Sequence, residues 1–240
     1  MNDLAIFISS VFAVELLPKL MSNNIFPDIF TFKNDIHRKS FDISLSSYET
    51  FFKINYIAEN RFSQSSIQNR FSYDKVIAID WSKDFFDTKS QFLLLYMQPA
   101  LLPMFRGYGA ITEQFLQGVC IGGITFYIPS EITDAGDIIY QKEIAISFDD
   151  YPMDYIGKIC DEIVNFLFFL EKGELQTIPQ DERYSFSIKR VRRKEGIINF
   201  RADAVSVYNK IRGYSKPFFG AYCYFKDCKI TVFRAKPEKW

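Results

Sequence analysis

The chain has 240 residues, of which 48% are hydrophobic and 18% aromatic, so it is long and apolar enough to bury the core of one domain with a small appendage. This composition excludes a disordered or fibrous protein. The 29 basic and 29 acidic residues cancel, which argues against a large nucleic-acid interface, because such an interface needs an excess of Lys and Arg.

The first half of the chain alternates short apolar strands with helical stretches, the pattern of a sheet covered by helices. Strands are expected, in chain order, at residues 4–9, 28–33, 54–58, 75–81 and 92–97. Helices are expected at 10–21 and 109–116, the second stopped by Gly118. Two long strands, 119–128 and 138–146, enclose a polar turn. We therefore predict an α/β fold with a Rossmann-like parallel or mixed sheet and helices on both faces.

The second half begins with the clearest helix, which follows Pro152 and is stopped by Gly173, with apolar residues at helical spacing between them. A polar linker (176–183) leads into a short strand and then a helix over 204–212, with Asp203 as its N-cap. Strands at 221–226 and 229–234 are expected to form a hairpin that turns at Asp227-Cys228. We predict a main domain over 1–175 and an extension with a helix and a β-hairpin over 176–240.

Several classes of protein do not fit this sequence. No apolar stretch approaches the roughly 18 residues that span a bilayer, and the first three residues give no basic start of a signal peptide. The four cysteines fit no metal or disulfide spacing, and His37 is the single histidine. The turn after the first strand lacks glycine, which disfavours a dinucleotide dehydrogenase, and no phosphate-binding loop of a P-loop NTPase is present. We expect a cytoplasmic protein without a metal site.

Two segments near the middle of the chain carry the chemistry. Residues 98–107 read Gln-Pro-Ala-Leu-Leu-Pro-Met-Phe-Arg-Gly and follow a buried strand, and residues 133–137 read Thr-Asp-Ala-Gly-Asp. Ligands of open α/β sheets bind at the carboxyl ends of the strands. Together these segments resemble the folate-dependent N-formyltransferases, whose hallmarks are an Asn-x-His-Pro-Ser-Leu-Leu-Pro loop followed by Arg-Gly and an Asp-x-Gly turn.

The C-terminal part agrees with this resemblance, which covers roughly residues 75–234. Residues 195–200 (Glu-Gly-Ile-Ile-Asn-Phe), 208–212 (Tyr-Asn-Lys-Ile-Arg) and 216–222 (Lys-Pro-Phe-Phe-Gly-Ala-Tyr) follow in the order of the appended region of the sugar-nucleotide and methionyl-tRNA branches. The resemblance implies formyl transfer from N10-formyltetrahydrofolate to a substrate amine, which needs donors for an oxyanion and a base for the amine.

The resemblance also implies the catalytic residues. Asp134 occupies the position of the family's Asp, whereas Tyr96 and Gln98 stand where the family has Asn and His. A Gln amide and a Tyr hydroxyl can donate to an oxyanion, but Gln cannot exchange a proton near neutral pH. The sequence therefore leaves two readings open: a formyltransferase with an altered catalytic centre, or a protein that binds folate or a sugar nucleotide without catalysis.

The same resemblance suggests binding residues. For the folate we select Trp81, Ser82, Asp84, Phe85, Thr133 and Asp137. For the acceptor we select Phe105, Arg106, Lys189 and Arg190. Simpler interpretations are a core position for Trp81 and a solvated strand end for the basic cluster at 189–194.

Among the substrate branches, sugar N-formyltransferases fit best. Glycinamide ribonucleotide formyltransferases would end near Gly173, and methionyl-tRNA formyltransferases carry a longer, basic C-terminal domain. The implied acceptor is a dTDP- or UDP-linked amino sugar of bacterial surface polysaccharides, such as the O-antigen of lipopolysaccharide. Tyr222, Tyr224 and Phe225 place aromatic side chains on both faces of the expected hairpin, and an isolated hairpin is marginal in water. We therefore predict a homodimer formed through residues 221–234.

Overall fold

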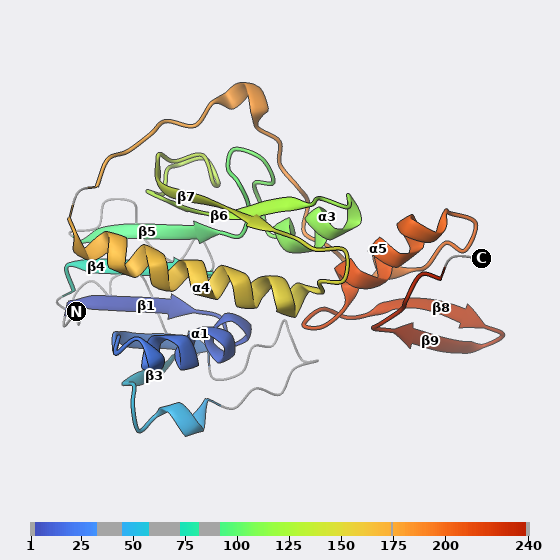
Figure 1. Ribbon diagram of the computed structural model, residues 1–240, viewed down its shortest axis with the longest axis horizontal. Coiled ribbons are helices and arrows are strands. Elements are labelled where there is room, and N and C mark those ends of the chain that lie inside the picture. Colours follow the sequence, from blue (N-terminus) through green and yellow to red (C-terminus); the bar gives the residue numbers. More distant parts are fainter. Residues whose placement is uncertain (1–2, 33–44, 58–72, 82–91, 174, 239–240) are drawn as a thin grey trace.

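Figure 1 shows the computed structural model, which describes residues 3–32, 45–57, 73–81, 92–173 and 175–238. A seven-stranded sheet has the order β3-β2-β1-β4-β5-β6-β7. Its strands are β1 (Leu4–Ile8), β2 (Asp28–Phe32), β3 (Ile54–Ile57), β4 (Lys75–Ile79), β5 (Leu93–Gln98), β6 (Ile121–Tyr127) and β7 (Ile138–Ala145). Strands β1 to β5 are parallel, and β6 and β7 add antiparallel. The predicted α/β fold with a mixed sheet is confirmed.

The strand order reverses at β1, since β2 and β3 lie on one side of it and β4 to β7 on the other. Such a reversal opens a crevice at the carboxyl ends of the two central strands, β1 and β4. Both strands read as nearly continuous apolar runs because both of their faces are buried. In Figure 1 the arrowheads of β1 and β5 point toward the C-terminal part of the chain.

Helices α1 (Ser10–Ser22) and α4 (Pro152–Glu171) pack against one another and share one core with the sheet. Phe126 of β6 stacks on Phe166 of α4 with 3.6 Å between ring centroids. Helix α4 begins where the sequence predicts, because Pro152 occupies its first turn and the Tyr151 amide donates to the Asp154 carboxylate at 2.9 Å.

The opposite face of the sheet carries a separate, aromatic cluster. Its buried members include Phe7, Phe30, Trp81, Tyr96 and Tyr127. Phe7 and Phe30 stack at 4.4 Å between centroids. Tyr96, one of the predicted catalytic residues, belongs to this cluster, and Gln98 follows it at the end of the same strand, β5.

The C-terminal part docks through helix α5 (Ala204–Tyr214) onto α3 (Ala110–Leu116). Buried Arg212 donates from Nη1 to the backbone carbonyls of Ser147, Phe148 and Asp150 at 2.6–3.2 Å. Asp203 caps α5 as predicted, since its carboxylate accepts from the Ser206 amide at 2.9 Å. Strands β8 (Ala221–Phe225) and β9 (Cys228–Val232) form their own two-stranded sheet.

Two local predictions are wrong. The hairpin turns at Lys226-Asp227 rather than Asp227-Cys228, because Phe225 pairs with Cys228 and Lys226 takes the positive φ of +51° that the turn needs. The short strand expected after Arg183 is reduced to a single bridge between Ser187 and Arg106. A 3-10 turn at Glu182–Tyr184 precedes it, capped by Asp181.

Within the described ranges, no helix combines the length and apolar character needed to cross a membrane. The same part of the chain brings no three His, Cys, Asp or Glu side chains together as a metal site.

Candidate active site

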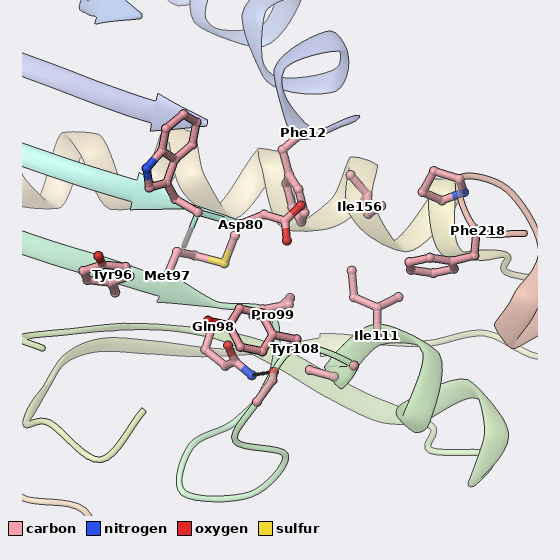
Figure 2. Close-up of a pocket in the computed structure, with 15 residues that line it drawn as sticks. Phe12, Asp80, Tyr96, Met97, Gln98, Pro99, Tyr108, Ile111, Ile156 and Phe218 are labelled. Carbon is pink, nitrogen blue, oxygen red and sulfur yellow. Dashed lines mark hydrogen bonds between the residues drawn. The ribbon is translucent and has the colours of Figure 1, made fainter. Parts of the chain in front are cut away.

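A crevice lies at the carboxyl ends of β4 and β5, beside the point between β1 and β4 where the strand order reverses (Figure 2). Its walls are mainly apolar and come from both halves of the chain; they include Phe12, Met97, Pro99, Ile111, Ile156, Pro217 and Phe218. Among its polar lining residues are Asp80, Tyr96, Gln98 and Tyr108. Apolar walls around a few polar groups are typical of ligand sites.

Gln98, the last residue of β5, is 4% exposed and holds the loop that follows it. Its Nε2 donates to the carbonyl oxygens of Phe105 at 2.8 Å and Gly107 at 2.9 Å. An amide nitrogen has two hydrogens, and these two bonds use both. The expectation that Gln98 can donate to an oxyanion is therefore wrong for this arrangement, which leaves only its Oε1, an acceptor, for a ligand.

Asp134 reaches the same loop from the turn between β6 and β7. It is 2% exposed, and its carboxylate accepts from the Gly107 amide at 2.7 Å and from the Tyr127 hydroxyl. Burial, together with the neighbouring Asp134 carboxylate, raises the pKa of Tyr127 well above its ordinary value, so the phenol stays a donor. Gly107 therefore links Gln98 and Asp134, one through its carbonyl and the other through its amide.

Gly107 must be glycine here. Its φ is +110°, and a Cβ at this position would lie 2.5 Å from the Ile188 carbonyl oxygen. The backbone of 186–188 pairs with Arg106 at this point, since the Arg106 amide donates to Phe186 at 3.1 Å and the Ile188 amide to Arg106 at 2.8 Å. Arg106 and Gly107 thus allow the loop to pack closely against residues 186–188.

Tyr96 lies two residues before Gln98 on β5, so the two side chains leave the same face of that strand (Figure 2). It is 2% exposed and belongs to the aromatic cluster, with 6.2 Å between its ring centroid and that of Tyr127. The three predicted catalytic residues therefore gather around one site, although Asp134 is not among the residues that line the crevice itself.

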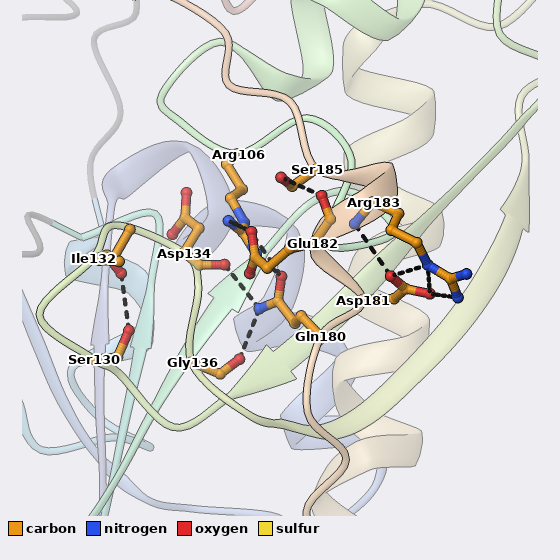
Figure 3. A network of polar contacts seen from close by, with 10 residues as sticks. All are labelled: Arg106, Ser130, Ile132, Asp134, Gly136, Gln180, Asp181, Glu182, Arg183 and Ser185. Carbon is orange, nitrogen blue, oxygen red and sulfur yellow. Dashed lines mark hydrogen bonds and ion pairs between the residues drawn. The ribbon is translucent and has the colours of Figure 1, made fainter.

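Arg106, selected as an acceptor ligand, is instead engaged with the linker that follows α4 (Figure 3). Its guanidinium donates to both carboxylate oxygens of Glu182, at 2.7 and 2.9 Å, and to Gln180 Oε1 at 2.7 Å. Gln180 Nε2 in turn donates to the carbonyls of Asp134 at 2.8 Å and Gly136 at 2.7 Å. We call residues 178–188 the strap, because they tie the Asp134 turn to the 98–107 loop.

The strap should contribute measurably to stability. In Gln180→Ala the carbonyls of Asp134 and Gly136 lose their donor and Arg106 loses an acceptor, which should cost about 1–3 kcal/mol of unfolding free energy. Urea denaturation measures this loss. Gln176→Ala, at an exposed position of the same linker, is the matched control and should change stability by less than about 0.5 kcal/mol. Equal effects of the two variants would contradict the role of the strap.

The remaining predicted residues fall into three groups. Trp81 is 3% exposed and stacks on Phe32 at 4.2 Å, so it belongs to the core while also lining the crevice. Thr133 and Asp137 are exposed on the turn that carries Asp134. Phe105 is buried, with its ring edge-on to Phe186 at 4.7 Å. Ser82, Asp84 and Phe85 lie outside the described residues.

The basic residues Lys189 and Arg190 are exposed. They lie close to Gly109, because a Cβ added to that glycine would be 3.1 Å from the Lys189 carbonyl oxygen. Arg190 lines a second hollow, continuous with the crevice. The two share five residues: Asp80, Tyr108, Gly109, Pro217 and Phe218.

Sequence reasoning missed Asp80, Phe218 and the strap. Asp80 directly follows β4, and a polar residue at the carboxyl end of a central strand is a signal that could have identified it. Nothing in a polar linker distinguishes Gln180 or Glu182 from other solvated residues.

Family models support the resemblance. The model described as "Formyl transferase" matches residues 81–167, and the model described as "Formyl transferase, C-terminal domain" matches residues 190–239. A methionyl-tRNA formyltransferase from Sulfurihydrogenibium sp. (strain YO3AOP1) is 30% identical over 141 residues, which are 57% of this chain and 45% of that protein. The match thus spans less than half the length of that curated relative.

Solved structures show the same fold. A sugar N-formyltransferase from Shewanella sp. FDAARGOS_354 superimposes with a TM-score of 0.68 at 15% identity and covers 99% of this chain and 98% of its own. HypX from Aquifex aeolicus, crystallised with tetrahydrofolic acid, gives a TM-score of 0.68 at 16% identity over 98% of this chain and 38% of its own.

Proposed function

The chain belongs to the formyl transferase family in both its N-terminal and its C-terminal parts, and from this premise we propose that it transfers a formyl group from N10-formyltetrahydrofolate to the amine of a dTDP- or UDP-linked amino sugar. The observation that carries the proposal is the convergence of Gln98 and Asp134 on Gly107 at the carboxyl end of β5. It places a buried carboxylate beside the crevice in which an acceptor would lie.

The reaction forms a bond from the acceptor nitrogen to the formyl carbon and breaks the bond from that carbon to N10 of the folate. The attacking nitrogen loses a proton, N10 gains one, and the products are the N-formyl sugar and tetrahydrofolate. Asp134 is the candidate base, since it is a buried carboxylate held in place by Tyr127 and Gly107. Tyr96 is the candidate oxyanion donor through its hydroxyl. Gln98 holds the loop, and no proton transfer is assigned to it.

Trp81, Ser82, Asp84, Phe85, Thr133 and Asp137 remain the proposed folate contacts, and Phe105, Lys189 and Arg190 the proposed acceptor contacts. Arg106 is better assigned to the strap, because its guanidinium already meets Glu182 and Gln180. We retain the proposed boundary near residue 175 between a formyltransferase-like domain and its extension, and the proposed cytoplasmic location.

The net charge of zero favours the sugar acceptor over methionyl-tRNA, because it offers little attraction for a tRNA backbone. The fold does not separate the two acceptors, since the sugar N-formyltransferase covers 99% of this chain and 98% of its own and a methionyl-tRNA formyltransferase from Clostridium thermocellum covers 99% and 94%.

A non-catalytic binding function is the second candidate, and the Gln98 geometry favours it. Both amide hydrogens are used by the loop, and no titratable group stands at this position. Calorimetric titration with 5-formyltetrahydrofolate, dTDP and UDP, beside a formyl-transfer assay with dTDP- and UDP-linked amino sugars and methionyl-tRNA, separates the candidates. Turnover with an amino sugar supports the proposal, binding without turnover supports the second candidate, and turnover with tRNA alone refutes the sugar acceptor.

We propose in addition that the β8–β9 hairpin joins two copies of the chain. Tyr224 is 61% exposed on one face of the hairpin, and Phe225 (65%) and Ile230 (45%) are exposed on the other. A two-stranded sheet with uncovered apolar side chains is marginal in water, and a second copy would cover it.

Phe225→Glu should therefore weaken the dimer at least tenfold, because a carboxylate would be buried against an apolar partner. Sedimentation equilibrium measures the change. Val205→Glu, which places the same charge on an exposed apolar position of α5, is the control and should leave the mass unchanged. A wild-type mass of one chain at all concentrations would refute the dimer.

A further inference from the structure

The strap is anchored beside the start of β7, where Ile138 and Ile178 exchange two backbone hydrogen bonds of 2.8 Å, and two residues later Gln180 reaches the turn that carries Asp134. We propose that Gln180 is a positioning residue for the Asp134 carboxylate: it clamps the backbone of the turn, and this clamp sets where the candidate base lies. The catalytic consequence rests on the proposed function, whereas the clamp itself is measurable without turnover.

The turn at Asp134 has a conformation that needs support from outside. Asp134 has a φ of +57°, a left-handed conformation that is uncommon for a residue with a side chain. Gly136 has no room for a side chain, since a Cβ there would lie 1.6 Å from the Ile128 carbonyl oxygen. Gln180 Nε2 donates to the carbonyls of Asp134 and Gly136, at 2.8 and 2.7 Å (Figure 3). One amide group thus spans the turn and fixes the direction in which the Asp134 side chain leaves the backbone.

The neighbours of Gln180 fix the orientation of its amide. Arg106 donates to Gln180 Oε1 from Nη2 at 2.7 Å and from Nε at 3.3 Å. A guanidinium has donors only, so the amide oxygen must face Arg106 and the amide nitrogen must face the two carbonyls of the turn. Arg106 is 5% exposed, and both carboxylate oxygens of Glu182 accept from its guanidinium. Arg106 and Glu182 therefore keep the Gln180 amide in its donating orientation.

Asp134 is held from two directions by neighbouring residues of the loop. The Gly107 amide donates to the Asp134 carboxylate at 2.7 Å. Arg106, the preceding residue, acts on the Asp134 carbonyl through Gln180. The loop therefore fixes the side chain of Asp134 directly and its backbone through the strap. Loss of the clamp lets the turn move relative to the loop, and a misplacement of about 1 Å at a reacting group can cost about 10²-fold in rate.

Gln180→Glu tests the clamp with a side chain of nearly the same shape. Its carboxylate still accepts from Arg106, but the second oxygen faces the two carbonyls without a hydrogen to donate. We expect the Gly107 amide to exchange with deuterium at least about tenfold faster, because the Asp134 carboxylate no longer stays beside it. In turnover, kcat should fall about ten- to hundredfold, while the KM of the amino sugar changes less than about twofold. Gln176→Glu, the same change at an exposed position of the linker, is the control and should alter neither readout.

Gln180→Met removes the donor without placing a negative charge against the turn, and it should produce the same changes to a smaller extent. The amide of Ile77, in the middle of buried β4, serves as the reference for global unfolding.

Exchange of Gly107 at the wild-type rate in both variants would overturn the clamp, and so would equal acceleration of Gly107 and Ile77, which indicates a loss of stability alone. Faster exchange of Gly107 with an unchanged kcat would overturn the catalytic consequence. If the wild-type chain formylates no amine, the proposed function fails, and the exchange rates decide the clamp by themselves.

Discussion

Asp134→Asn is expected to lower formyl transfer about 10²–10⁴-fold, the range for removing a general base. The Asp134 carboxylate is the one candidate base held between two donors, the Gly107 amide and the Tyr127 hydroxyl. An asparagine can accept from one of them with its oxygen but presents an amide group to the other. Single-turnover transfer to an amino sugar measures the loss.

Tyr127→Phe distinguishes a role of Asp134 as the base from a role in holding the turn. It removes the phenol that donates to Asp134 but keeps the carboxylate and the Gly107 contact. We expect a loss of about 1–3 kcal/mol in stability, since the buried carboxylate loses a donor, with at least a tenth of the wild-type activity retained. If both variants lose activity equally, Asp134 acts through the shape of the turn, and its assignment as the base is wrong.

The sheet could be predicted because its strands are unambiguous. Lys75–Ile79 and Leu93–Gln98 are short, mainly apolar runs, a pattern typical of strands that are buried on both faces. The hairpin turn was misplaced by one residue because Lys226, rather than a glycine or asparagine, takes the positive φ. Local propensity alone does not identify such a residue.

The site was predicted in its members but not in its hydrogen bonds. A motif places Gln98, Arg106 and Asp134 near one another, yet it does not reveal which atoms meet. In the structure the Gln98 amide donates hydrogen bonds to the loop, and the Arg106 guanidinium donates to the strap. These partners come from residues far apart in sequence, 74 and 76 positions for the two contacts of Arg106, and no spacing rule connects them.

This difference changes what the substitutions at the catalytic centre mean. In the resemblance, Gln98 replaces a histidine and Tyr96 an asparagine. Gln98 only holds a loop, so its exchange leaves the space for the formyl donor unchanged. Tyr96, in contrast, fills space within a packed aromatic cluster. Reversal of both changes should therefore restore chemistry at some cost in packing.

The double variant Tyr96→Asn with Gln98→His should raise formyl transfer by orders of magnitude. Exchange of the Tyr96 hydroxyl for the family's asparagine donor contributes at most about 10²–10³, and acid–base chemistry contributes about 10²–10⁴. The two effects overlap, so their product is an upper bound. The loop loses two hydrogen bonds and the aromatic cluster loses a ring. By comparison with other truncations of buried aromatic side chains, the free energy of unfolding should fall by about 3–5 kcal/mol. Rates should therefore be expressed per folate-binding site.

Two further variants decide what the gain means. Addition of Asp134→Asn to the double variant should abolish it, because the amine must still lose a proton before the tetrahedral intermediate collapses. Gln98→His alone should give little, since the family's asparagine donor remains absent and Tyr96 still occupies its place. If the double variant binds folate well and still moves no formyl group to any amino sugar, the altered centre is not a drifted catalyst, and ligand binding without chemistry becomes the function of this crevice.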